Sequence, residues 1–330
     1  MTGAVETLNA QLERADFILC ASEEQRALYL GQLASLGRVN TLNYLRDDTL
    51  RSLLTVVPFG IESNAPEHKN KVLRGVREGF GPDDRILLLS GGLYDWFDPE
   101  TLIRAVARLA QDHPNVRLFF QGTKHPHPGV PEMPVLRESR ELASRLGVLG
   151  VNVFFNDAWV EYSERSNFLL EADAGVSTHF QHLETTFSFR TRILDYIWAR
   201  LPMVVTDGDH FARVVREHGL GIVVPERDEE ALREALARTL FDEQFREDVA
   251  SRFDLVREHY MWPVVLEPLV EFVRDPKPAP DRAAGWARPH TRRRKKQYGF
   301  VHDARRTIHY LLHGGPRVVA EKVRLRLGRA

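Results

Sequence analysis

The sequence predicts an α/β fold with a doubly wound parallel sheet, and three observations carry this prediction. From residue 85 onward, short apolar runs alternate with patterns of helical period. The apolar runs are nearly continuous, as in strands that are covered on both faces. The chain has 330 residues and is 43% hydrophobic, which allows a sizeable core.

The predicted strands and helices of this region follow each other in strict alternation. We expect strands at 86–90, 116–121, 151–155, 174–177, 203–206 and 221–224. We expect helices near 99–111, 135–146, 161–171, 189–200, 209–217 and 229–240. In a doubly wound sheet of order 3-2-1-4-5-6, ligands bind beyond the carboxyl ends of the strands, where the first and fourth strands are neighbours.

The remaining segments differ from this domain in their pattern. Residues 16–21 predict a strand, Ser22 is the expected cap of a helix, and residues 55–57 predict a return strand. We therefore divide the chain into a short N-terminal α/β segment at 1–62, a polar linker at 63–84, the main domain with its closing helix at 85–275, and a basic C-terminal tail at 276–330.

The charge of the chain is unevenly distributed. Residues 276–330 carry 15 Lys and Arg against 3 Asp and Glu, a net charge of +12, whereas the rest of the chain carries −13. A basic tail with an amphipathic pattern suits an anionic membrane surface, with nucleic acid as the competing partner and a solvated tail as the third alternative. We adopt the membrane surface and expect no nucleic-acid partner.

Cysteine usage and hydropathy indicate the compartment. Cys20 is the single cysteine, so an internal disulfide is excluded, and its apolar neighbours indicate a small buried residue rather than a nucleophile. No apolar run approaches the roughly 20 residues of a membrane span, and the first residues lack the pattern of a signal peptide. We expect a cytoplasmic protein that associates with the inner face of the membrane where its tail binds.

Candidate site residues concentrate between residues 177 and 209. Ser188 is the expected N-cap of a helix whose first turn then holds Phe189, Arg190, Thr191 and Arg192. A cation near the positive end of a helix dipole is disfavoured by about 0.3–1 kcal/mol, unless an anion binds among the free N–H groups. A diphosphate fits, because arginine binds phosphate oxygens bidentately.

Two carboxylates keep a second interpretation of these arginines open. In the first interpretation Asp195, about one turn along the helix, accepts hydrogen bonds from sugar or ribose hydroxyls. In the second, Glu184 and Asp195 simply neutralise the two arginines in a structural network. The sequence alone does not choose between them.

Four further residues are candidates for ligand contacts. Gly91 and Gly92 after the first strand of the domain allow a phosphate to approach the backbone, although two glycines are equally typical of a turn. Trp159 could stack on a nucleobase or pack against its own loop. His179 is expected to hydrogen-bond to substrate or loop rather than to bind a metal, since no ligand set accompanies it.

Several segments in the same order resemble the family-four glycosyltransferases, a large retaining group with the GT-B fold. The resemblance rests on the runs ADFILCAS and VVPFGI, the unit LLLSGGLYDWFDPETLIRAVARL, the strand VRLFFQG, and the blocks EADAGVSTH and ILDYIWARLPMVVTDGD. It covers residues 15–275 and implies that the main domain is the Rossmann-like donor-binding half. It also implies a nucleotide-diphosphate-sugar donor and no metal or other cofactor.

The resemblance assigns roles and also departs from the family pattern. The family carries two glutamates eight positions apart; Asp195 stands at the second, while Phe187 stands at the first, so Glu184 is the expected substitute. The family's basic residues after the first strand are missing, so Arg190 and Arg192 are expected to hold the diphosphate. By analogy Gly91 and Gly92 approach the phosphates, and Ser188, Phe189 and Thr191 offer donors.

The resemblance further implies that residues 1–62 are only a remnant of the acceptor-binding N-terminal domain. We therefore expect a separate N-terminal half or self-association. The expected activity is transfer of a sugar from a UDP- or GDP-sugar to a glycan or lipid-linked acceptor in cell-surface polysaccharide synthesis. The alternatives are a catalytically silent nucleotide-sugar binding or assembly module, and a membrane-surface binding protein that acts through its tail.

Overall fold

A six-stranded parallel sheet forms the centre of the main domain in the computed structural model, which describes residues 2–123, 127 and 132–285. The strands are β3 (Arg85–Gly92), β4 (Val116–Gly122), β5 (Val153–Phe155), β6 (Ala174–Ser177), β7 (Met203–Thr206) and β8 (Gly221–Val224). Their order is β5-β4-β3-β6-β7-β8, with every pair parallel. This is the predicted doubly wound order, with β3 and β6 as neighbours at the switch point.

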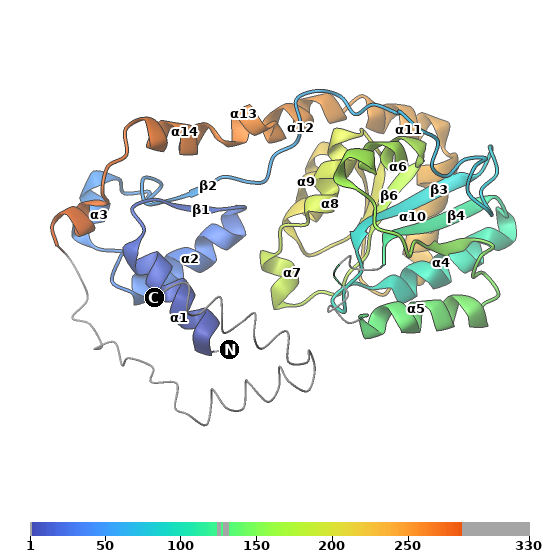
Figure 1. Ribbon diagram of the computed structural model, residues 1–330, viewed down its shortest axis with the longest axis horizontal. Coiled ribbons are helices and arrows are strands. Elements are labelled where there is room, and N and C mark those ends of the chain that lie inside the picture. The colour runs from blue at the N-terminus through green and yellow to red at the C-terminus, as the bar shows by residue number, and fades with distance from the viewer. Residues whose placement is uncertain (1, 124–126, 128–131, 286–330) are drawn as a thin grey trace, which may run out of the picture. The chain divides into compact units, whose positions relative to one another are not determined.

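Helices cover both faces of this sheet (Figure 1). Ile86 and Leu88 of β3 pack with α6 (Arg165–Glu171), α8 (Thr191–Trp198) and α9 (His210–His218). Leu87 and Leu89 point to the other face and pack with α4 (Pro99–Asp112), α5 (Pro134–Arg145) and α10 (Glu229–Phe241). Because successive side chains of a strand alternate between faces, burial on both faces explains the continuous apolar runs.

The structure corrects the predicted start of the helix that carries the arginines. A short helix, α7 (Leu183–Phe187), precedes it, and Ser188 is the C-cap of α7 rather than an N-cap. Helix α8 begins at Thr191 with Arg190 in the N-cap position and no side-chain cap. The predicted helix at 161–171 is likewise divided, into a 3-10 turn (Tyr162–Glu164) and α6.

The N-terminal segment builds a small α/β unit around a two-stranded parallel sheet. Its elements are α1 (Thr2–Arg14), β1 (Ile18–Cys20), α2 (Glu23–Ser35), α3 (Thr41–Arg46) and β2 (Leu54–Val56). Ser22 caps α2 as predicted, by accepting a hydrogen bond from the backbone N–H of Gln25. Cys20 is buried, and this burial raises the pKa of its thiol to about 11.

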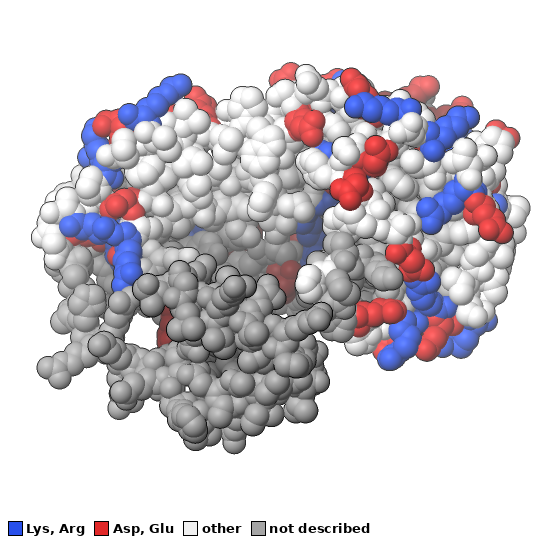
Figure 2. Space-filling model, viewed as in Figure 1, with Lys and Arg blue, Asp and Glu red and all other residues white. Residues whose placement is uncertain are grey.

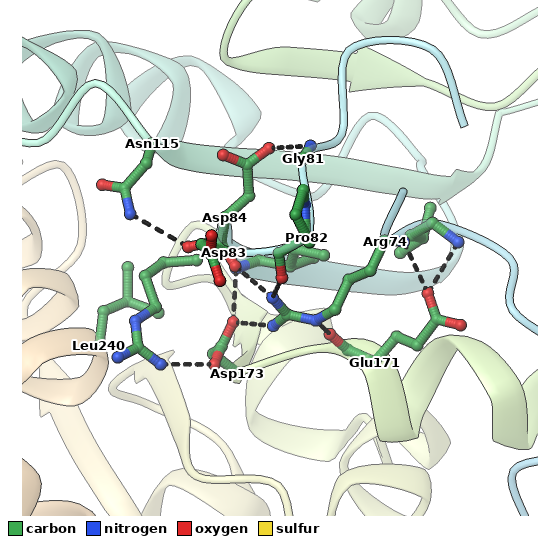
Figure 3. Close-up of polar contacts among 12 residues, drawn as sticks. Arg74, Gly81, Pro82, Asp83, Asp84, Asn115, Glu171, Asp173 and Leu240 are labelled. Carbon is green, nitrogen blue, oxygen red and sulfur yellow. Dashed lines mark hydrogen bonds and ion pairs between the residues drawn. The ribbon is translucent and has the colours of Figure 1, made fainter. Parts of the chain in front are cut away.

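The segment between β2 and β3, predicted as a polar linker, has no helix or strand but is firmly bound. The carboxylate of Glu171 accepts hydrogen bonds of 2.8 Å from the backbone N–H groups of Val72, Leu73 and Arg74. Figure 3 shows Arg74 reaching Asp173 with its guanidinium group while its backbone faces Glu171. One acidic pair at the amino end of β6 therefore fixes this segment to the sheet.

The chain closes with helices that lead back to the N-terminal unit. These are α11 (Glu243–Ala250), α12 (Phe253–Tyr260), α13 (Trp262–Val265), α14 (Glu267–Arg274) and α15 (Pro280–Ala283). Arg38 binds Asp281 with Nε at 2.6 Å and Nη2 at 3.1 Å, and both side chains are buried. Residues 276–285, assigned to the tail from sequence, thus pack on the N-terminal unit, and the rest of the basic tail, 286–330, lies outside the described residues.

Charges on the described surface are mixed. Figure 2 shows Lys and Arg side chains beside Asp and Glu side chains on one face. The exposed ion pairs include Arg108 with Glu229 at 3.2 Å and Glu230 at 2.8 Å. Such pairs contribute about 0–1 kcal/mol each, so they keep the surface solvated rather than stabilise the fold. None of the described helices combines the length and apolar character that a membrane crossing requires.

Candidate functional site

A cavity of about 840 Å³ lies beyond the carboxyl ends of β3, β4 and β5. Four residues predicted as ligand contacts line it: Gly91, Gly92, Trp159 and Asp195. Its volume lies in the range of about 300–1,000 Å³ that small-molecule sites occupy. The cavity thus occurs where ligands bind in doubly wound folds.

Glycine is required at the end of β3 for steric reasons. Gly91 has a φ of 74°, in the region that L side chains rarely adopt. A Cβ on Gly122, at the end of the neighbouring strand β4, would lie 2.5 Å from the carbonyl oxygen of Gly91. A Cβ on Gly92 would lie 2.8 Å from the ring of Tyr94. Because these glycines have no Cβ, the ends of β3 and β4 and the ring of Tyr94 can approach each other closely and form one wall of the cavity.

Asp195 presents a carboxylate to the cavity and is held there by Arg165. The Nε of Arg165 lies 3.3 Å from Oδ1 of Asp195, and Nη2 lies 3.1 Å from Oε1 of Glu62. The same guanidinium lies 3.5 Å from the ring centre of Tyr162. Burial raises the pKa of Asp195, and Arg165 opposes that effect. Asp195 is therefore a positioned hydrogen-bond acceptor with one oxygen already engaged.

Two aromatic side chains at the cavity leave much of their surface open. Trp159 is 58% exposed and Tyr162 is 67% exposed, and both line the cavity. Both lie at the same cavity, so together they offer aromatic surface to a ligand that enters it. Trp159 is thus available for a planar ligand group, whereas Arg165 already covers one face of Tyr162.

Arg190 is buried in an ion-pair network instead of lining the cavity. Its Nε lies 2.9 Å from Oδ2 of Asp209, and its Nη2 lies 3.5 Å from Oε2 of Glu184. Its guanidinium also lies 5.1 Å from the ring centre of Phe97. The network interpretation thus describes this arginine, but with Asp209 and not Asp195 as the second carboxylate.

Arg192 lies behind the glycine loop. Its Nη2 donates a 2.7 Å hydrogen bond to the carbonyl oxygen of Gly92, and its guanidinium lies 4.2 Å from the ring centre of Phe97. Burial lowers its pKa to about 10. Its Nη1 has no hydrogen-bond partner within the described ranges. The arginine therefore fixes the loop that forms one cavity wall and keeps one donor unused.

The unused donor belongs to a group of unpartnered polar atoms at the ends of β3 and β6. Among the described residues, the others at these two strand ends are the hydroxyls of Ser90 and Ser177 and both ring nitrogens of His179, whose Nε2 lies 3.9 Å from Oδ2 of Asp209. Burial and the nearby Arg190 lower the pKa of His179 to about 3, so its ring is neutral at physiological pH. Buried polar groups are nearly always hydrogen-bonded, so such a group marks a place where water or a ligand supplies partners.

The remaining predicted residues lie around this region without lining the cavity. The Oγ of Ser188 lies 3.3 Å from the carbonyl oxygen of Thr185, and the ring of Phe189 packs on Phe211 with centres 4.7 Å apart. Thr191 is exposed at the start of α8. Roles for these three residues in ligand binding stay predictions, as do those of Glu184, Arg190 and Arg192.

Comparison with protein families identifies the domain that carries this cavity. Residues 84–242 match the family model described as glycosyl transferases group 1. This segment is a group 1 glycosyltransferase domain. Among curated proteins, no relative matches the chain by sequence.

Solved structures show that the group 1 domain sits in a GT-B fold with a Rossmann-like sheet, as the sequence predicted. Sucrose-phosphate synthase from Thermosynechococcus elongatus is 17% identical, with a TM-score of 0.57, over 83% of this chain and 61% of that chain. An E. coli trehalose-6-phosphate protein bound with UDP-2-fluoro glucose is 17% identical, with a TM-score of 0.62, over 83% and 64%. Anabaena HepE in complex with UDP and glucose is 15% identical, with a TM-score of 0.60, over 83% and 67%.

Two residues of the group 1 domain that the sequence did not point to are Tyr162 and Arg165. They start a predicted helix after the third strand, and Arg165 stands 30 residues before the carboxylate it binds. The only sign of this pair in the sequence is that an aromatic residue and a cation lie three positions apart, and this spacing is common on the surface of any helix. Among the described residues, no group of three or more His, Cys, Asp or Glu side chains is arranged to hold a metal ion.

Proposed function

We propose that this chain is a retaining glycosyltransferase that transfers a sugar from a nucleotide-diphosphate donor to a glycan or lipid-linked acceptor. The observation that carries the proposal is the cavity at the strand ends, which combines a glycine wall, exposed aromatic rings and one positioned carboxylate. Two of the similar structures hold UDP or a UDP-sugar, which favours UDP as the nucleotide. The chain spans only 61–67% of the length of the three compared chains. The activity of the whole enzyme, including its acceptor and the linkage that it forms, is therefore part of the proposal.

We assign each part of the donor to a group in or beside the cavity. The base stacks on Trp159, the ribose hydroxyls donate to Asp195, and the diphosphate approaches the backbone at Gly91 and Gly92. The sugar then extends toward the unpartnered atoms at the ends of β3 and β6, where neutral His179 can hydrogen-bond to it. Polar groups that are already desolvated interact strongly with the ligand that reaches them.

The reaction itself needs charge stabilisation and orientation more than a protein nucleophile. The acceptor hydroxyl oxygen forms the new bond to the anomeric carbon while the bond from that carbon to the diphosphate oxygen breaks. The departing phosphate takes the hydroxyl proton, so the step balances without another reactant. Positioned donors at the developing negative charge are worth several kcal/mol, about 2.7–4 for one donor in a characterised case. Arg192 serves here by holding the Gly92 carbonyl, so that the adjoining wall keeps its shape.

Calorimetric titration of UDP and GDP into the wild-type chain and Asp195→Ala tests the proposal. We expect UDP to bind and the variant to bind at least about tenfold more weakly, because a hydrogen bond to a charged group contributes roughly 1.5–3 kcal/mol. Asp157→Ala is a matched control, because its carboxylate lines the same cavity but pairs with Arg140. No nucleotide binding, or equal affinities for wild type and Asp195→Ala, would contradict the donor site.

A silent nucleotide-sugar binding module is the second candidate, and burial of Arg190 among carboxylates favours it, because that cation is then not available to the diphosphate. Incubating the chain with a UDP-sugar and a lipid-linked acceptor pool separates the two. Turnover supports the enzyme, whereas binding without turnover, alone and with an added N-terminal half, supports the module.

We also propose that the basic tail binds anionic membranes. The test is co-sedimentation of the protein with anionic liposomes. Co-sedimentation that survives deletion of residues 286–330 would contradict this proposal.

A further inference from the structure

An aromatic pair projects from the loop between β3 and α4, next to the proposed donor cavity. The rings of Tyr94 and Trp96 stack with centres 4.8 Å apart and planes 11° apart. They nevertheless remain 37% and 39% exposed. The Phe97 ring also lies beside Trp96, with ring centres 6.2 Å apart, so the exposed part of Trp96 is the surface that these two neighbours leave uncovered.

The loop that carries this pair is held rigidly. The backbone N–H of Asp98 donates a 3.0 Å hydrogen bond to the carbonyl oxygen of Thr178, and that of Phe180 donates a 3.4 Å bond to Trp96. Phe97 and His179 form an antiparallel bridge. Because these contacts hold the backbone of the loop, an exposed ring that the loop carries loses less conformational freedom when it binds a ligand.

The aromatic loop separates two hollows. Tyr94 lines the donor cavity, whereas Trp96 is not among the described residues that line it. Asp95 and Phe97, the chain neighbours of Trp96, line a second groove of about 400 Å³, which also involves the first residues of α4 and α5. Trp96 itself is not among the described residues that line this groove. A ligand that occupies the second groove and reaches Trp96 from its chain neighbours therefore lies outside the donor cavity.

The charge of the second groove restricts what binds there. Its lining contains four carboxylates, on Asp95, Asp98, Glu100 and Glu138, against the single cation of Arg145. Asp98 caps α4 and Glu100 pairs with Arg104, yet the groove remains net negative. A negative groove repels phosphates and acidic sugars, whereas carboxylate oxygens accept hydrogen bonds from neutral hydroxyls.

We propose that the second groove and the exposed surface of Trp96 bind a neutral oligosaccharide as the acceptor. This inference rests on the proposed function and adds the class of acceptor to it. The apolar C–H face of one pyranose ring packs on Trp96, and hydroxyls of the adjoining rings donate to the exposed carboxylates of the groove, Asp95, Glu100 and Glu138. The chain end that is to be extended then lies at Tyr94, in the wall of the donor cavity.

Saturation-transfer NMR on the full chain with UDP present tests this placement. The probes are maltotriose, cellotriose and chitotriose, with trigalacturonate as the acidic counterpart. We expect saturation on ring C–H protons of the neutral trisaccharides and not of trigalacturonate. Trp96→Ala should weaken their binding at least tenfold and retain a UDP signal, because Trp96 does not line the donor cavity. Trp262→Ala is the matched control, because Trp262 is 38% exposed and lies on α13.

Each outcome bears on one of the two proposals. If the wild type shows no UDP signal, the donor site is overturned. The acceptor groove is judged independently, since the sugar signals are measured separately. A UDP signal without saturation of any neutral trisaccharide overturns the acceptor groove, because stacking uses the C–H face that all three share. Equal binding of trigalacturonate, or unchanged sugar binding by Trp96→Ala, overturns it as well. Circular dichroism confirms that each variant is folded.

Discussion

Replacing Arg190 with alanine distinguishes a structural ion pair from a diphosphate contact. Loss of a buried ion pair lowers the stability of the fold, whereas loss of a ligand contact lowers only the affinity for the nucleotide. The Arg190 and Asp209 side chains are each only 4% exposed, with Nε 2.9 Å from Oδ2. Arg190→Ala leaves a buried carboxylate without its cation, which typically costs about 3–5 kcal/mol. At roughly 2–4 °C per kcal/mol for a domain of 150–250 residues, we expect the melting temperature to fall by about 10 °C.

The pH dependence of this loss reports on the two titrating groups beside Arg190, Asp209 and His179, and both predict the same direction because Arg190 lowers the pKa of each. Burial raises the pKa of Asp209, against the opposing effect of its hydrogen bonds from Ala212 and Arg190, and removing Arg190 raises it further. An acid whose pKa is higher in the folded state binds more protons when folded, so it stabilises the protein below its unfolded pKa and loses that effect as pH rises. The deficit of Arg190→Ala should therefore shrink as the pH is lowered.

A second substitution supplies the rescue. Asp209 also caps α9 by accepting from the backbone N–H of Ala212, and asparagine is an equally good cap. Arg190→Ala combined with Asp209→Asn should therefore recover most of the lost stability. Arg104→Ala is the control, because Arg104 forms an exposed pair with Glu100 that is worth only about 0.3–0.5 kcal/mol. An Arg190→Ala variant that melts like the wild type yet binds UDP more weakly would refute the network reasoning.

Three other variants test particular contacts. Arg165→Gln should weaken UDP binding and move its loss on acidification to higher pH, because burial already raises the pKa of Asp195 and Arg165 opposes this; calorimetry across pH checks it. Glu171→Gln should lower stability by at least about 2 kcal/mol at pH 7. Burial alone would raise the pKa of Glu171, but hydrogen bonds from His68 and the backbone lower it, so the wild type should lose this advantage below about pH 4.5, as urea unfolding would show. Tyr196→Phe should cost about 1–2 kcal/mol, because its hydroxyl bonds the carbonyl of Leu88 and the N–H of Ser90; an unchanged urea midpoint would contradict this.

The sheet could be predicted from sequence because each of its signals is local. The run from Ile86 to Leu89 is buried on both faces and is therefore apolar, and the strand-and-helix units that follow repeat this pattern. Strand order then follows from the restricted connections of doubly wound folds. The same local signals located the cavity edge at Gly91 and Gly92, because ligands bind where parallel strands end.

The site itself could be predicted only in part, because its decisive contacts join distant residues. Ser188 was expected as an N-cap on a preference worth about 1 kcal/mol, while the pairing of Arg190 with Asp209, 19 positions away, involves a larger free energy. The segment before β3 was predicted to be a linker, because the residue that holds it in place, Glu171, lies about 100 residues later in the chain. Arg165 was missed for the same reason.

The bond between Glu171 and three consecutive backbone amides also makes a loop resist exchange with solvent. Val72, Leu73 and Arg74 belong to no helix or strand, so their N–H groups would ordinarily exchange with water as fast as those of a surface turn. One carboxylate occupies all three, and it lies at the end of α6 beside the sheet core. Deuterium uptake at these amides therefore reports the opening of α6 from the sheet, in a stretch whose secondary structure gives no hint of it.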